Sequence, residues 1–138
     1  MSFRSATVLL FLSATLAWGF PACTPRNDNE SLEPTLRSIQ RNVFSVHCAL
    51  SGCHAGSTPE SQLNLETGNA YANLVSAPSI GFPDLLRVDP GHAERSYLIR
   101  KLKGIEIVGE RMPLGKAALP DSIIHVIRDW IDAGAPGE

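Results

Sequence analysis

Three chemically reactive side chains lie within seven consecutive residues near the middle of the chain. The segment Cys48-Ala49-Leu50-Ser51-Gly52-Cys53-His54 has four residues between two cysteines, and a histidine directly follows the second cysteine. A loop this short keeps both thiols and the imidazole close together in any fold. The segment therefore points to a crosslink, a metal site or an attached cofactor.

Two cysteines followed at once by a histidine form the pattern with which proteins attach a c-type haem. Each thiol adds to one haem vinyl group, and the adjacent imidazole binds the iron as an axial ligand. The usual spacer has two residues, whereas this one has four, and Ser51-Gly52 gives the longer loop freedom to pucker outward. We predict that Cys48 and Cys53 attach one haem c per chain and that His54 binds its iron.

Two other interpretations of the same residues stay open. Exported domains often carry disulfides, so Cys48 and Cys53 could form a bridge followed by a surface histidine. Zinc could instead be held by His47, Cys48, Cys53 and His54, although four ligands from one short loop would crowd a tetrahedral site.

A second axial ligand is predicted in the stretch Gly104–Lys116, which contains three glycines and Pro113 and reads as a loop. Met112 lies in this loop, and a thioether is a recognised axial ligand of haem iron. His92, after the turn signal Asp89-Pro90-Gly91, is a competing ligand. His125 lies about 200° from Ile123 around its helix and is expected to face solvent.

The first 33 residues read as an export signal and a tether. Residues 1–22 carry one charge, Arg4, and an apolar run from Ala6 to Ala17, which is the pattern of a signal peptide. Phe20-Pro21-Ala22-Cys23 resembles a bacterial lipobox, so Cys23 is a candidate for lipidation. Residues 23–33 are polar and suit a flexible tether. We predict a periplasmic or outer-envelope location, with any membrane contact made through the lipid.

Charge and composition exclude several classes of function. The chain has 12 basic and 14 acidic residues, and loss of Arg4 with the signal leaves 11 and 14, a formal charge of −3. No basic run is longer than Arg100-Lys101, so nothing resembles a nucleic-acid-binding surface. No Ser–His–Asp set, phosphate loop or paired carboxylate motif supports hydrolytic chemistry.

The hydrophobic pattern predicts an all-α domain over residues 34–138. Pro34 and Thr35 suit the start of a first helix, and Pro120, Asp121 and Gly134 suit the ends of a last one. The expected buried faces are Leu36, Ile39, Val43 and Val46 in the first helix and Ile123, Ile127, Trp130 and Ile131 in the last.

The middle of the chain predicts shorter elements. Leu63–Leu65 alternates like a brief strand, residues 67–74 could form two helical turns, and residues 85–88 read as extended. A helix is expected over residues 94–103, packing through Tyr97, Leu98 and Leu102 and closed by Gly104. Such a domain, with long loops, suits a fold built around an apolar haem.

These motifs together resemble the cytochrome c family, most closely its short planctomycete-type modules, over about residues 39–135. The segments that carry the resemblance are Cys48…Cys53-His54, Leu63-Asn64-Leu65, Ala70-Tyr71-Ala72-Asn73-Leu74-Val75, Ser96-Tyr97-Leu98, Gly109-Glu110-Arg111-Met112-Pro113 and Trp130-Ile131-Asp132-Ala133-Gly134. The resemblance implies terminal helices that cross beside the haem and a methionine, here Met112, opposite the histidine.

The expected function is therefore that of a monohaem electron carrier in the bacterial envelope rather than an enzyme. Its partners would be redox proteins that bind transiently near the haem edge at Cys48–Cys53. If Met112 does not bind iron, the alternative is a five-coordinate haem sensor or weak peroxidase. A third alternative is a haem-free surface module stapled by a Cys48–Cys53 disulfide.

Overall fold

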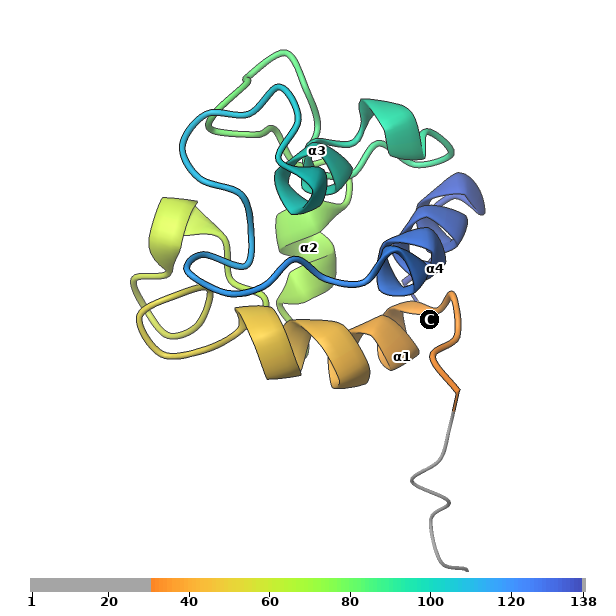
Figure 1. Cartoon of the computed structure of the whole chain (residues 1–138), viewed down its shortest axis with the longest axis horizontal. Helices are drawn as coiled ribbons and strands as arrows, with labels where there is room; N and C mark the ends of the chain where they lie inside the picture. The colour runs from red at the N-terminus through yellow and green to blue at the C-terminus, as the bar shows by residue number, and fades with distance from the viewer. Residues whose placement is uncertain (1–30, 138) are drawn as a thin grey trace, which may run out of the picture. The chain divides into compact units, whose positions relative to one another are not determined.

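A computed structural model describes residues 31–137, and within this range the chain is helical with no β-sheet (Figure 1). The α-helices are α1 (Leu36–Ile39), α2 (Ala70–Leu74), α3 (Tyr97–Lys103) and α4 (Asp121–Asp132), the π-helix is η1 (Gln40–Cys48), and the 3₁₀ turns are η2 (Glu60–Gln62) and η3 (Ala93–Arg95). The prediction of an all-α domain is confirmed at this level.

Helix α1 begins where the sequence predicts. Thr35 is the N-cap residue, and its hydroxyl oxygen accepts a hydrogen bond from the Ser38 backbone N–H at 3.2 Å. This bond satisfies one of the four N–H groups that have no partner in the first turn of a helix.

After one turn the first helix continues as the π-helix η1 and reaches Cys48 without a break in direction (Figure 1). Its last bond runs from the Ala49 N–H to the Phe44 carbonyl, five residues back, at 2.7 Å. A π-helix has more residues per turn than the α-helical spacing assumes. Phe44 is therefore buried, with 1% of its surface exposed, whereas Val46 is 52% exposed, so the prediction of a buried Val46 is wrong.

Helix α4 matches its predicted limits closely, with Pro120 as the N-cap, Asp121 in the first turn and Gly134 at φ +94° just after its end. An aspartate in the first turn interacts favourably with the helix dipole. Ile127, Trp130 and Ile131 are buried as predicted. Ile124 completes the buried face, however, while Ile123 is only half-buried.

The middle elements are shorter than the sequence suggests. Leu63–Leu65 forms no strand, because the Asn64 side chain accepts from the Glu66 N–H and turns the backbone. Isolated bridges pair Val75 with Val88 and Pro78 with Leu86. The predicted helix over 94–103 is divided into η3 and α3, and Gly104 closes α3 at φ +73° as expected.

One hydrophobic core joins these elements. α4 packs against α1, α3 and η3, and Trp130 lies fully buried with its indole N–H donating to the Pro136 carbonyl at 2.9 Å. The other fully buried apolar side chains of the described range include Ile39, Val43, Phe44, Leu74, Val88, Ile127 and Ile131. The helix that ends at Cys48 is thereby anchored in the core.

The π-helical register makes a prediction about stability. Phe44→Ala should lower the free energy of unfolding by about 3–5 kcal/mol, because it empties a fully packed site. Val46→Ala is the matched control and should change it by no more than about 0.5 kcal/mol. Denaturant unfolding measures both free energies. A larger loss of stability in Val46→Ala than in Phe44→Ala would contradict the π-helical register.

Candidate functional site

The segment Cys48–His54 folds back on itself directly after η1. The Cys53 N–H donates to the Leu50 carbonyl at 2.9 Å, and the His54 N–H donates to the Cys48 carbonyl at 3.2 Å. Gly52 makes the turn possible with φ +77°, a conformation that costs glycine little. The four-residue spacer therefore still brings His54 back beside the first cysteine.

Both thiols at this turn are free in the structure, Cys48 half-buried and Cys53 exposed. Burial raises the pKa of Cys48 to about 11; the positive charge of Lys116 opposes this shift, and Cys53 adds to it. The two thiols are therefore close enough for one to affect the pKa of the other.

The ring of His54 is held by a backbone carbonyl. Its Nδ1 lies 3.2 Å from the Glu60 carbonyl oxygen, which can only accept, so Nδ1 carries the proton. Burial is the main cause that lowers the pKa of His54, and it outweighs the backbone contacts with Glu60 and Leu63, which raise that pKa. In a neutral imidazole that carries its proton on Nδ1, Nε2 holds the lone pair with which histidine binds a metal ion.

The backbone around His54 is fixed as well. The His54 carbonyl accepts from the Leu65 N–H at 2.8 Å, and the Cys53 carbonyl accepts from the Glu60 N–H at 2.8 Å. The Glu66 carboxylate accepts from the Gly56 N–H at 3.1 Å and from the Asn64 side chain at 3.0 Å. The loop after the second cysteine is thus closed on itself by hydrogen bonds.

Met112 lies in the long loop that follows α3, and its backbone N–H donates to the Lys101 carbonyl at 2.9 Å. Its side chain is half-buried against the core. Upstream, the Lys101 ammonium donates to the Val108 carbonyl at 3.1 Å, and the Tyr97 hydroxyl accepts from the Val108 N–H at 3.0 Å. Helix α3 thereby fixes the backbone on the N-terminal side of Met112.

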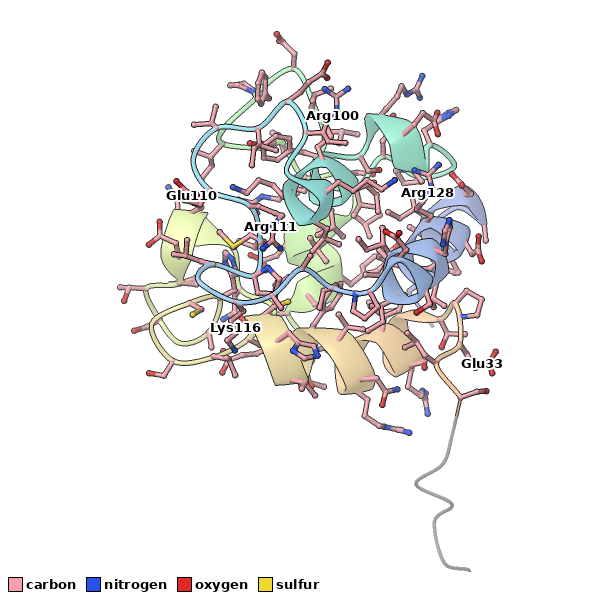
Figure 2. All side chains as sticks on the ribbon, viewed as in Figure 1. Glu33, Arg100, Glu110, Arg111, Lys116 and Arg128 are labelled. Carbon is pink, nitrogen blue, oxygen red and sulfur yellow. The ribbon has the colours of Figure 1, made fainter. Side chains whose placement is uncertain are left out.

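Arg111 fixes the other side of this loop. Its guanidinium donates to the Met112 carbonyl at 3.2 Å and to the Lys116 carbonyl at 2.9 Å. Lys116 belongs to the same loop, and its positive charge lies close enough to Cys48 to oppose the rise of that thiol's pKa caused by burial. In Figure 2 the yellow sulfur atoms of the described residues all lie in the part of the view around the Arg111 and Lys116 labels.

The competing ligand His92 belongs to a different part of the domain. Its neighbours Gly91 and Ala93 bond to the end of α4, through the Ile131 carbonyl at 2.8 Å and the Asp132 carboxylate at 2.8 Å. In Figure 1 this segment and the loop after Cys48 lie on opposite sides of the view. His125 is exposed, as predicted.

The zinc alternative finds no support among residues 31–137, where no group of three or more His, Cys, Asp or Glu side chains is placed to hold a metal ion. A haem iron does not need such a group, because the macrocycle supplies four of its ligands. Two thiols, a neutral imidazole and the thioether of Met112 fit a covalently attached haem by donor chemistry.

A groove in the described part of the chain lies away from the segment Cys48–His54. It has a volume of about 820 Å³ and is lined by residues of α1, η1 and the segment 67–71, including Arg37, Ser45 and Tyr71. None of its lining residues belongs to Cys48–His54 or to the Met112 loop. It therefore contributes nothing to the candidate site.

The predicted signal peptide and Cys23 lie outside the described residues, as does most of the predicted tether. Within the described range, none of the helices has the length and apolar character needed to cross a membrane. Scans of protein-family models, curated proteins and solved structures found no match to the chain. The resemblance to the cytochrome c family consequently rests on the motifs of the sequence.

Sequence reasoning missed the groups that hold the candidate ligands. The Glu60 carbonyl leaves no signal in a sequence, because every residue carries a carbonyl. Arg87 donates to the carbonyls of Asn73 at 2.8 Å and Ser61 at 3.0 Å, and its charge lowers the pKa of His54. The sequence feature that could have indicated a structural role for Arg87 is its position as the single cation in the apolar run Leu85–Val88.

The two thiols should differ in reactivity when no haem is attached. In the reduced chain from a host without haem-attachment machinery, iodoacetamide should modify exposed Cys53 first, because only a thiolate reacts and burial keeps Cys48 protonated. Modification of Cys48 should accelerate as the pH rises towards about 11. Peptide mass spectrometry measures both rates, and equal rates at pH 8 would contradict the described burial of Cys48.

Proposed function

We propose that this protein is a monohaem c-type cytochrome that carries single electrons. The observation that carries the proposal is the position of the His54 imidazole, whose Nδ1 lies against the Glu60 carbonyl. His54 directly follows Cys53, and both Cys53 and Cys48 are free thiols. Cys48 and Cys53 would form the thioether bonds to one haem c, and Met112 would be the second axial ligand. The domain over residues 34–138 would then be cytochrome c-like.

The residues around each candidate ligand suit electron transfer. The haem would supply an iron that changes oxidation state by one electron. His54 is held in place by its ring and its backbone, and Met112 by bonds on both sides, so neither ligand has to move far when the charge changes. A thioether ligand and burial both favour the reduced state.

The proposal includes a location and a class of partner. Haem attachment through thioethers needs thiols outside the reducing cytoplasm, which agrees with the signal-like residues 1–22. Lipid on Cys23 would anchor the domain through the polar residues that follow. Redox proteins would bind transiently at the exposed segment around Cys53, where thioether attachment would leave the haem edge near the surface.

The attachment of haem is tested by export in a host with haem-attachment machinery. The full chain should keep its haem after denaturing electrophoresis, and the stained band should disappear in the Cys48→Ser, Cys53→Ser double variant. Each single variant should retain one thioether bond. A chain that yields no haem band, or loses all its haem to acid–acetone extraction, would contradict the proposal.

The role of Met112 is tested by Met112→Leu, which keeps the packing volume and removes the sulfur. The reduction potential should fall, and carbon monoxide should bind faster because one axial position opens. His92→Ala is the control and should change neither quantity. The opposite pattern would make His92 the ligand, whereas a wild-type protein that already binds carbon monoxide rapidly would favour the five-coordinate sensor or peroxidase.

A further inference from the structure

Arg87 is held rigidly beside the loop that follows the second cysteine. Its N–H donates to the Ala77 carbonyl at 2.7 Å, and its carbonyl accepts from the Leu98 N–H at 2.9 Å. From this fixed backbone the half-buried side chain reaches two other segments, the end of α2 and the turn η2, at Asn73 and Ser61. A planar guanidinium can bridge two carbonyls, since its donors form a rigid fork.

The turn η2 has a backbone that needs outside support. Ser61 and Gln62 have φ of +54° and +53°, although neither is a glycine. Such left-handed conformations are unfavourable for residues other than glycine and persist where the surroundings enforce them. The bond from Arg87 to the Ser61 carbonyl is one such support, since it fixes the peptide plane within the strained pair.

The strained pair directly follows the residue that holds His54. The Glu60 carbonyl accepts from His54 Nδ1, and Ser61 is the next residue. A rotation of the 61–62 backbone would therefore move the Glu60 carbonyl away from the imidazole. The chain of contacts runs from the guanidinium to the Ser61 carbonyl, through one peptide unit, to the His54 ring.

We propose that Arg87 is a positioning residue for His54, which it orients through the Glu60–Ser61 turn. That His54 is an iron ligand rests on the proposed function, whereas the orientation itself is a property of the chain. The guanidinium remains charged at all accessible pH values, so this support does not weaken with pH.

The exchange of the His54 Nδ1 proton with water tests this inference on the reduced, full-length exported protein by NMR. Arg87→Met should accelerate the exchange roughly tenfold, because the turn that carries the accepting carbonyl loses one of its supports. The bond from the Leu63 N–H to the Glu60 carbonyl, at 3.2 Å, remains in this variant. Arg87→Lys keeps the charge but bonds one carbonyl at a time, so it should restore part of the protection. If Arg87→Met does not fold, Arg87→Lys alone tests the inference. Its exchange rate should then lie between roughly twofold and tenfold above that of the wild type.

Arg95→Met is the matched control, because Arg95 is a surface arginine, 55% exposed and paired with Asp89, in the segment on the opposite side of the view from the cysteine loop. It should leave the exchange within twofold of wild type. The same rate in the Arg87 and Arg95 variants would overturn the inference. The measurement does not require haem, so a haem-free protein that still shows the Arg87 effect would refute the proposed function and retain this inference.

Discussion

The hydrogen bonds that close the segment from Cys48 to Leu65 determine where the two thiols and the imidazole of His54 can lie. The His54 N–H bonds back to Cys48, its carbonyl bonds forward to Leu65, and its ring bonds to Glu60. Leu65 is itself buried in the core, so these bonds connect a surface loop to the hydrophobic interior. Without them the unusually long spacer would leave the thiols and the imidazole in no fixed relation.

Other hydrogen bonds of the domain fix the loop that contains Met112. The first helix enters the core through Ile39 and Phe44 and delivers Cys48 at its end, while α3 holds the Met112 loop through Tyr97 and Lys101. Lys116, in the Met112 loop, lies close enough to the Cys48 thiol for its charge to affect the pKa of that thiol, which burial raises. Two loops that are each fixed by hydrogen bonds would suit a haem, because its ligands have to keep the same positions in both oxidation states of the iron.

Local signals in the sequence predicted the parts of the fold that local chemistry decides. The cap at Thr35, the closure at Gly104 and the limits of α4 each depend on one or two neighbouring residues. The register of the first helix failed at Val46, because no sequence pattern distinguishes a π-helical stretch from an α-helical one. The supports of His54 could not be predicted either, since Arg87 reaches Ser61 across 26 positions and only the tertiary fold joins them.

Proton NMR of the reduced full-length protein tests the proposal that one haem iron is held between His54 and Met112. A methyl group bound over the face of a haem experiences the strong ring current of the macrocycle. The Met112 methyl resonance should lie far upfield of all other signals and disappear in Met112→Leu. A Met112 methyl resonance at an ordinary aliphatic frequency in the wild-type protein would contradict the account.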